Sequence, residues 1–472
     1  MSNKTTMRIA AIASAAAISA TAGAEGAATG TDHDHAASTG VHRTAVRARI
    51  RTANEEKVLY AFKGGTDGAN PSGSLIADSS GNLYGTAGFG GDSNCHVTRS
   101  HFYDHRVKEN PGCGIVFRLS TAGHETILHT FAGGNDGAGP PGALYEDANG
   151  NLFGVTAAGG RTKACHKGCG TVFEITSGGS ETLLYAFSGG NGNDGAAPDG
   201  TLTVDSSGNF YGTTAAGGSS ANCGAGGPGG CGTVFELTSS GIESVLHTFA
   251  DGRSDGAYPG GSLVLDKSGN AYGLTPAGGS DGDCGLGADG CGVLFEISSG
   301  GVESILHRFT GGSDGAYPSG NPVIDGAGNI YFTTVGGGGA TDCGLGPYGC
   351  GVLFKYTSGT LTVLHTFSGG SDGAYPIGGI LLDARGNVFG TTGGGGSTRN
   401  CGLGGSFGCG IVFKVSSGST ETVLHAFKGG KNDGAYPTSG LLSLNNHLYG
   451  MTMTGGTGCH KAGCGTVFEV KE

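Results

Sequence analysis

Charged side chains are scarce in this sequence. They make up 14% of its 472 residues, against roughly 25% in typical globular domains, while 102 residues are Gly. Little charge and much Gly favour closely packed strands and tight turns over amphipathic helices. Positive charge is scarcest, since the net charge is -12. This excludes non-specific nucleic-acid binding, because phosphate contacts need Lys and Arg.

Long apolar runs are also missing beyond the N-terminus. Residues 1–24 read as a signal peptide, with Lys4 and Arg8 before an Ala-rich apolar run and small residues at a cleavage site. The run is too short for a membrane anchor, because the hydrocarbon core is about 30 Å thick. We therefore expect a secreted or periplasmic protein without a membrane span. Residues 25–55, polar and rich in Ala, Gly and Thr, are expected to form a disordered linker.

What the chain does contain is a pattern of four short apolar runs that occurs seven times within residues 56–472. Three markers recur once per copy. The first closes a VLHTF-like run: Phe62, Phe131, Phe187, Phe249, Phe309, Phe367 and Phe427. The second lies in a TVF-like run: Phe117, Phe173, Phe235, Phe295, Phe354, Phe413 and Phe468. The third follows the turn after the first run, which is Gly-Asn in six of the copies: Tyr84, Phe153, Tyr211, Tyr272, Tyr331, Phe389 and Tyr449.

Each copy reads as four strands, named a to d, that are rich in β-branched and aromatic residues. Strands a and b join through D-x-x-G-N, in which Asp binds the turn backbone and Gly accepts a positive φ. Four strands repeated seven times predict an all-β fold, a seven-bladed β-propeller with four antiparallel strands per blade. The repeat region begins with a strand d, residues 57–62, and ends with a strand c. We expect the first run to complete the last blade and so to close the ring.

The combined pattern D-x-x-G-N-x-Y-G-T-T, G-x-V-F, V-L-H-x-F and D-G-A-x-P resembles the GloVer tandem repeat of secreted bacterial proteins. The first part is also similar to NHL-type propeller repeats. The resemblance covers nearly the whole mature chain. It implies export and a propeller-like array, without a settled activity. Members of the family carry varied C-terminal anchors, whereas we expect none here.

Two cysteines occur in every copy, always between strands b and c. An even count, local pairs and an export signal together predict seven disulfides. The alternative is zinc ligation, for which Cys165, His166 and Cys169 have part of the usual spacing. The predicted pairs are Cys95/Cys113, Cys165/Cys169, Cys223/Cys231, Cys284/Cys291, Cys343/Cys350, Cys401/Cys409 and Cys459/Cys464.

The loops between these cysteines differ among the copies. Copies three to six have Gly-rich inserts with little charge, whereas copies seven, one and two carry His and basic residues. In a closed ring these three copies are neighbours, so their loops predict one sector that binds an anionic group such as a uronate, or a metal through imidazoles. The alternative is a solvated loop that has merely diverged. The residues are His460 and Lys461, His166 and Lys167, and His96, Arg99, His101, Tyr103, Asp104, His105, Arg106, Lys108 and Glu109.

The loops between strands d and a carry D-G-A-x-P in every copy. Its Asp is expected to cap backbone N–H groups, and calcium is the alternative because oxygen-rich turns bind it. The variable residue is an aromatic in copies four to seven, where it either stacks on sugar rings or packs on the following Pro. These aromatics are Tyr258, Tyr317, Tyr375 and Tyr436.

A His or Tyr recurs on strand d in every copy. Because Tyr replaces His twice, we expect a half-buried residue that forms structural hydrogen bonds, not a catalytic group. Neither H-E-x-x-H nor a P-loop occurs, so zincin and NTPase chemistry lack support. The positions are Tyr60, His129, Tyr185, His247, His307, His365 and His425.

Two functions fit these observations. The first is an extracellular binding module for a carbohydrate or a protein partner, acting as a monomer without a cofactor. The second is a carbohydrate-active enzyme, best a polysaccharide lyase on an acidic glycan, which needs a base, an acid and a cation. The sequence leaves open whether the protein is an enzyme. Candidate catalytic residues are His101, Tyr103, His105, Arg106, His166 and His460.

Overall fold

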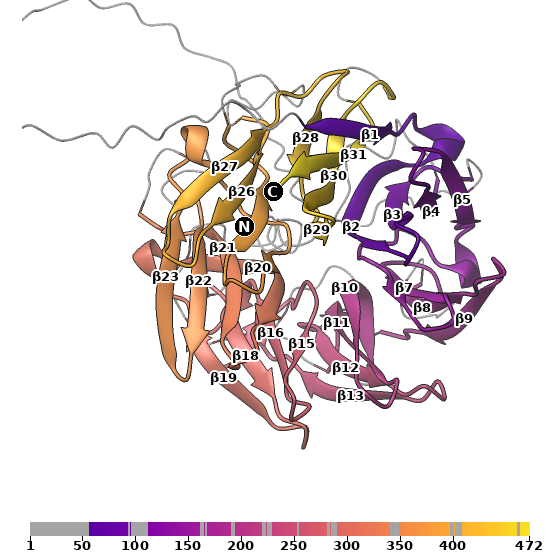
Figure 1. Ribbon diagram of the computed structural model, residues 1–472. Coiled ribbons are helices and arrows are strands. Elements are labelled where there is room, and N and C mark those ends of the chain that lie inside the picture. Colours follow the sequence, from indigo (N-terminus) through magenta and orange to yellow (C-terminus); the bar gives the residue numbers. More distant parts are fainter. Residues whose placement is uncertain are drawn as a thin grey trace, which may run out of the picture.

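The computed structural model describes residues 56–92, 95, 112–160, 165, 168–189, 194–219, 223, 229–252, 254–280, 284, 290–339, 343, 349–396, 401, 408–459 and 463–472. Within them, seven antiparallel blades stand around one axis and follow one another in sequence order (Figure 1). The predicted all-β, seven-bladed propeller is confirmed. No helix in this part of the chain is long and apolar enough to cross a membrane. The signal peptide (1–24) and the linker (25–55) lie outside the described residues.

Six blades each have a sheet of four strands in sequence order, a to d from the axis outward. Blade one contains β2 (Ala69–Ala77), β3 (Leu83–Phe89), β4 (Ile115–Leu119) and β5 (Glu125–Thr130). Blade two contains β6 (Tyr145–Glu146), β7 (Leu152–Thr156), β8 (Thr171–Ile175) and β9 (Glu181–Ala186). Blade three contains β10 (Gly195–Val204), β11 (Phe210–Gly217), β12 (Thr233–Leu237) and β13 (Glu243–Thr248). Blade four contains β15 (Val264–Leu265), β16 (Ala271–Thr275), β18 (Val293–Ile297) and β19 (Glu303–Arg308). Blade five contains β20 (Ala316–Ile324), β21 (Ile330–Gly336), β22 (Val352–Thr357) and β23 (Thr360–Thr366). Blade six contains β24 (Leu381–Leu382), β25 (Val388–Thr392), β26 (Ile411–Val415) and β27 (Glu421–Ala426).

Blade seven combines the two ends of the described chain. Its sheet holds β28 (Gly434–Pro437), β29 (Leu442–Leu444), β30 (His447–Gly455) and β31 (Thr466–Lys471) together with β1 (Lys57–Ala61). β1 pairs antiparallel with β31, with Lys57 opposite Glu469 and Ala61 opposite Thr466. Short elements complete the described residues: the pair β14 (Gly256–Ala257) and β17 (Ala277–Gly278) in blade four, and the 3-10 turns η1 (Gly65–Asp67), η2 (Gly134–Asp136), η3 (Gly312–Asp314) and η4 (Gly370–Asp372).

In blades one to six, D-x-x-G-N turns join strands a and b as predicted, whereas Asn445 and Asn446 form this turn in blade seven. In blade one, Asp78 accepts hydrogen bonds from the backbone N–H groups of Ser80 and Asn82, both at 2.9 Å. Gly81 has a φ of 81°, which a residue without a Cβ adopts at little cost. The Asp side chain therefore accepts hydrogen bonds from N–H groups that would otherwise have no partner within the turn.

Pairs of buried Phe residues join neighbouring blades. The Phe at the end of each strand d meets the Phe of strand c in the next blade; Phe187 and Phe235, for example, have ring centroids 5.1 Å apart in an edge-on arrangement. Both rings are at most 1% exposed. The equivalent pairs are Phe62–Phe117, Phe131–Phe173, Phe249–Phe295, Phe309–Phe354, Phe367–Phe413 and Phe427–Phe468. The two Phe markers of the repeat thus form the aromatic contacts between blades.

A backbone hydrogen bond also crosses every blade boundary. The variable residue of D-G-A-x-P has a φ between 53° and 64° in all seven copies, and its N–H donates to the carbonyl of the second Cys in the preceding blade. The donors and acceptors are Asn70 and Cys464, Gly139 and Cys113, Ala197 and Cys169, Tyr258 and Cys231, Tyr317 and Cys291, Tyr375 and Cys350, and Tyr436 and Cys409.

Candidate functional site

The candidate catalytic residues and the two candidate ligand-binding lysines lie in three loops between cysteines. These residues fall outside the described part of the chain: His101, Tyr103, His105, Arg106, His166, His460, Lys167 and Lys461. The cysteines at the loop ends are described, so the structure locates the anchors of the predicted sector.

All seven predicted disulfides are present. They join Cys95 to Cys113, Cys165 to Cys169, Cys223 to Cys231, Cys284 to Cys291, Cys343 to Cys350, Cys401 to Cys409 and Cys459 to Cys464. All fourteen cysteines are among the described residues and none is free. Zinc ligation by thiolates, the alternative considered from the sequence, is therefore excluded.

The disulfides and the loops between strands d and a lie at the same end of the propeller. A Cβ built on Gly133, in the loop after β5, would lie 2.9 Å from the Sγ atom of Cys95 and 3.5 Å from that of Cys113. A Cβ on Gly311, in the loop after β19, would lie 3.3 Å from the Sγ atom of Cys284. One end of the ring therefore carries both sets of loops.

The anchors of the three His-containing loops belong to successive blades. The N–H of Asn70, at the start of blade one, donates to the carbonyl of Cys464 in blade seven at 2.8 Å. The N–H of Gly139, at the start of blade two, donates to the carbonyl of Cys113 in blade one at 2.7 Å. Blades seven, one and two are thus consecutive around the ring, and their disulfides are neighbours.

The four tyrosines of D-G-A-x-P differ in exposure. Tyr317 and Tyr375 are buried, with 2% and 6% of their surface exposed, whereas Tyr258 and Tyr436 are half-buried. A buried ring offers no face to a sugar, so Tyr258 and Tyr436 are the two with surface available. Ligand binding by these tyrosines remains a prediction.

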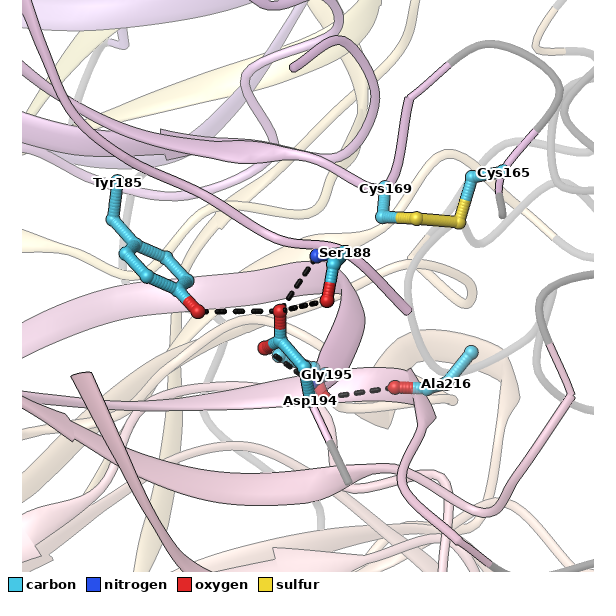
Figure 2. Close-up of a disulfide and its surroundings, with 8 residues drawn as sticks. Cys165, Cys169, Tyr185, Ser188, Asp194, Gly195 and Ala216 are labelled. Carbon is cyan, nitrogen blue, oxygen red and sulfur yellow. Dashed lines mark hydrogen bonds between the residues drawn. A yellow bond between two sulfur atoms is a disulfide. The ribbon is translucent and has the colours of Figure 1, made fainter. Parts of the chain in front are cut away.

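The Asp of D-G-A-x-P organises the loop in which it lies, as predicted. Figure 2 shows Asp194 near the disulfide Cys165–Cys169. Asp194 Oδ2 accepts hydrogen bonds from the N–H and the hydroxyl of Ser188, both at 2.6 Å, and from the hydroxyl of Tyr185 at 3.2 Å (Figure 2). The same N–H cap occurs in the other six loops: Lys63 to Asp67, Ala132 to Asp136, Ala250 to Asp255, Thr310 to Asp314, Ser368 to Asp372 and Lys428 to Asp433.

The His or Tyr of strand d lies next to this Asp, and its predicted structural role is confirmed. Tyr60 and Tyr185 donate to Asp67 and Asp194. A β-bulge in strand d places the aromatic residue; in β13, for example, Val234 pairs with His247 and Phe235 with Val245. Imidazole Nε2 and carboxylate Oδ1 are 2.8 Å apart in His129–Asp136, 3.4 Å in His247–Asp255, 2.9 Å in His307–Asp314, 3.0 Å in His365–Asp372 and 3.4 Å in His425–Asp433.

A second carboxylate reaches this pair from the next blade, a feature that we did not predict. We call each resulting group an inter-blade cluster: the His or Tyr, its Asp, and a Glu four residues before the His or Tyr of the following strand d. The six clusters are Tyr60–Asp67–Glu125, His129–Asp136–Glu181, Tyr185–Asp194–Glu243, His247–Asp255–Glu303, His365–Asp372–Glu421 and His425–Asp433–Glu56. At the boundary of blades four and five, Leu361 replaces the Glu.

The six Glu side chains share one unusual environment. In each, the Oε1 atom is buried without a hydrogen-bond partner. Burial is the main reason why every one of their pKa values is raised. The pKa reaches about 8 for Glu56, where Asp433 adds to the effect, and about 7 for Glu125, Glu243 and Glu421. The clusters therefore hold carboxylates at the outer rim of the ring that are poorly satisfied when ionised.

The pKa of Glu243 makes stability depend on pH. Burial, together with the charge of Asp194, raises it from 4.5 to about 7, although the hydroxyl of Tyr185 opposes the shift. The folded protein therefore retains a proton that the unfolded chain releases above about pH 4.5. The stabilisation from this group is complete below pH 4.5 and is lost as the pH rises through about 7. We expect Glu243→Gln, which mimics the protonated side chain, to be about 1 kcal/mol more stable than the wild type at pH 8 and equal to it below pH 4.5. Urea unfolding at a series of pH values measures this difference, and a wild type that is more stable at pH 8 would contradict it.

One acidic residue also interrupts the repeat close to the axis. Asp199 lies on β10, the innermost strand of blade three, where the other copies have Ser72, Pro141, Gly260, Ser319, Ile377 and Thr438. Burial raises its pKa to about 6, and its Oδ1 accepts a hydrogen bond from the N–H of Gly200 at 2.9 Å. Comparing the residue after the Pro of D-G-A-x-P across the copies would have revealed it.

G-x-S-x-G, the motif of a nucleophile elbow, is expected by chance in a chain this rich in Gly. It occurs, for instance, at residues 311–315 and 369–373. Ser313 and Ser371 lie in the 3-10 turns η3 and η4. A nucleophile elbow requires a strand, a sharp turn and then an α-helix. Among the described residues these turns connect strand to strand, so they do not form an elbow.

Solved structures resemble this chain at low sequence identity. A gluconolactonase from Xanthomonas campestris is 13% identical with a TM-score of 0.38, over 91% of this chain and 93% of that one. The extracellular domain of a protein assigned as a hybrid two component system of B. thetaiotaomicron is 11% identical with a TM-score of 0.48, over 90% of this chain and 43% of that one. This chain thus spans about two fifths of the second protein's structure. No curated protein matches the chain.

The model of the Gloeobacter/Verrucomicrobia repeat matches four overlapping segments, residues 36–224, 105–344, 223–403 and 285–472. Together they include every blade and every inter-blade cluster described above. The chain therefore belongs to the Gloeobacter/Verrucomicrobia repeat family.

Proposed function

We propose that this protein is an extracellular binding module that holds a carbohydrate or a protein partner on the end of the propeller with the disulfides. The observation that carries the proposal is the way in which this end is fixed. Each loop between strands b and c is closed by a disulfide, and each loop between strands d and a is held by its Asp cap. Variable loops on rigid anchors lose little entropy when they bind a ligand.

The compartment follows from the same chemistry. Seven disulfides persist where thiols are oxidised, outside the cytosol. We infer that residues 1–24 direct export and that the mature protein works in the periplasm or outside the cell.

The sector of blades seven, one and two is the proposed binding surface. Its loops contain His and Lys or Arg residues, whereas the protein as a whole is acidic. A local excess of positive charge attracts anions, and a uronate-containing glycan presents carboxylates at regular spacing. His101, His105, His166 and His460 are the residues proposed to contact it, with Lys167 and Lys461 beside them.

A polysaccharide lyase is the second candidate. The loop between Cys95 and Cys113 supports it, because it combines imidazoles with Tyr103 and Arg106 in a single segment. A lyase needs a base, an acid and a cation against the uronate, and these side chains supply all three.

A glycan array with the mature protein, including acidic polysaccharides, tests the proposal. We expect an acidic glycan to bind and expect His101→Ala with His105→Ala to weaken binding about tenfold, the effect of losing about one charge-assisted contact. Tyr348→Ala, in the Cys343–Cys350 loop of blade five, is the matched control and is expected to leave binding unchanged. Equal weakening by both variants would contradict the proposed sector. Release of unsaturated products from a bound glycan would show that the protein is a polysaccharide lyase and not only a binding module.

A further inference from the structure

Two inter-blade clusters differ from the others, and we propose that each binds one divalent transition-metal ion of the zinc type. The first cluster is Glu56, His425 and Asp433, and the second is His247, Asp255 and Glu303. In each, an imidazole nitrogen and two carboxylate oxygens lie within 4.8 Å of one another. Imidazole and carboxylate together are a donor set that suits zinc.

The length of the loop before the Asp distinguishes these two clusters. Five residues separate Phe249 from Asp255, and five separate Phe427 from Asp433, whereas four separate Phe309 from Asp314. In the longer loops the Asp Oδ1 atom accepts the N–H of the following Gly at 2.7 Å. The N–H of Gly315, after the shorter loop, instead donates to the carbonyl of Gly312.

The additional bond draws the carboxylate away from the imidazole. Nε2 and Oδ1 are 3.4 Å apart in His247–Asp255 and in His425–Asp433. They are 2.8 to 3.0 Å apart in the three His–Asp pairs with four-residue loops, which is the distance of an ordinary hydrogen bond. Two ligands bound to zinc at about 2.0–2.1 Å with tetrahedral angles are about 3.4 Å apart. The longer loop thus lengthens the contact between His and Asp, which in His247–Asp255 is still a hydrogen bond, to the spacing of two metal ligands.

The buried imidazole of His425 points to a missing partner. Its side chain is 9% exposed, and its Nε2 atom has no hydrogen-bond partner. The edge-on contact with the ring of Phe427, at 4.7 Å between centroids, fixes the orientation of the imidazole. The buried Oε1 atom of Glu56 lacks a partner as well. Two buried polar atoms without partners at one place are costly, and one cation satisfies both.

Each ion would join two blades. Glu56 directly precedes β1 of blade seven, while His425 lies on β27 of blade six. His247 lies on β13 of blade three, while Glu303 lies on β19 of blade four. Bound metal therefore resists separation of these neighbours and stabilises the ring, because it binds the folded state only. Calcium, the cation considered from the sequence, prefers six to eight oxygen ligands and does not fit a set that includes imidazole.

Titration of the chelator-treated, oxidised full chain with zinc chloride tests the proposal. Calorimetry gives the number of ions bound, and we expect Glu56→Gln and Glu303→Gln each to lower that number by one. The double variant is expected to lose two. Glu421→Gln, in a cluster whose His365 is hydrogen-bonded to Asp372, is the matched control and keeps the wild-type number. Ions at other His residues contribute equally to every variant and cancel in these differences.

A second variant separates loop length from ligand identity. Deletion of Lys431 leaves Glu56, His425 and Asp433 in place and shortens the loop to the four-residue form seen at residues 132–135. We expect this variant to bind one zinc ion fewer and to fold, with circular dichroism like that of the wild type. Zinc is expected to raise the Tm of the wild type more than that of either site variant. An unchanged number of ions in Glu56→Gln and Glu303→Gln, or an equal loss in Glu421→Gln, would overturn the proposal.

Discussion

Gly232→Ala is expected to lower the free energy of unfolding by about 3 kcal/mol or more, the combined effect of backbone strain and overpacking. Gly232 follows Cys231 and has a φ of 94°, in the left-handed half of the Ramachandran plot. A Cβ at this position would lie 2.6 Å from Cδ of Pro259, in the next blade, and would overlap the carbonyl oxygen of Thr214. Neither neighbour is a flexible side-chain end, so the blades must move apart.

Gly241→Ala is the matched control for this substitution. Gly241 lies in the turn between β12 and β13, with a φ of 83°, and the nearest atom to its Cβ is the carbonyl oxygen of Leu184 at 3.9 Å. Only the backbone cost applies there, about 1 kcal/mol. Urea unfolding followed by circular dichroism measures both, since the chain has no Trp to serve as a fluorescent probe. Equal losses would mean that the contact with Pro259 is unimportant.

The same contact recurs at every blade boundary, so the effect of Gly232 is a property of the repeat. The Gly after the second Cys always faces the Pro of the next D-G-A-x-P. The pairs are Gly465–Pro71, Gly114–Pro140, Gly170–Pro198, Gly232–Pro259, Gly292–Pro318, Gly351–Pro376 and Gly410–Pro437. Residues from two neighbouring blades thus determine how closely their sheets approach.

Sequence periodicity was sufficient to predict the blades because the contacts that form each blade join residues within one copy of the repeat. A turn such as Asp78 to Asn82 and a disulfide such as Cys223–Cys231 involve residues within one copy. Their patterns are therefore visible in each copy separately. The His of strand d could be interpreted for the same reason, because its Asp lies seven or eight residues later in the chain.

The inter-blade clusters could not be predicted from one copy. Glu243 stands at the start of a strand, where a charged residue is usually solvent-exposed. Its partners Tyr185 and Asp194 belong to the preceding boundary, 58 and 49 residues earlier. Only the ring geometry brings them together. A Glu stands four residues before the His in four copies and before the Tyr in two. The partners of that Glu, however, belong to the preceding blade, which one copy does not reveal.

Tyr317 illustrates a second limit of sequence interpretation. An aromatic between Ala and Pro in this loop suggested either a platform for a sugar or packing on the following Pro. The structure shows that a φ of 57° directs the chain so that the ring packs into the core with 2% of its surface exposed. The left-handed conformation was hidden because Tyr seldom adopts it. Asn70 and Gly139, at the same position in blades one and two, carry the usual signal for it.

Phe187→Ala is expected to cost about 3–5 kcal/mol, the loss for a large apolar side chain removed from a close-packed core. Its ring is fully buried and contacts Phe235 of the next blade edge-on. Because the Phe187 ring lies between two sheets, its removal leaves a cavity at the blade boundary. Neither sheet can fill this cavity alone. Ile242→Ala, on the same pair of blades but 64% exposed, is the control and is expected to change stability by less than about 0.5 kcal/mol.

A double-mutant cycle separates the aromatic contact from simple burial. We expect Phe187→Ala and Phe235→Ala to be non-additive by about 0.5–1.5 kcal/mol, the range for edge-on aromatic pairs. The boundary of blades four and five provides an internal comparison. Phe332 occupies a position that is Gly in the other blades, such as Gly212, and the centroids of Phe309 and Phe354 are 6.1 Å apart. Phe309 there contacts Phe332 as well, at 5.9 Å, so its coupling to Phe354 should be the weaker one. Equal coupling energies at the two boundaries would show that burial, not ring geometry, holds the blades together.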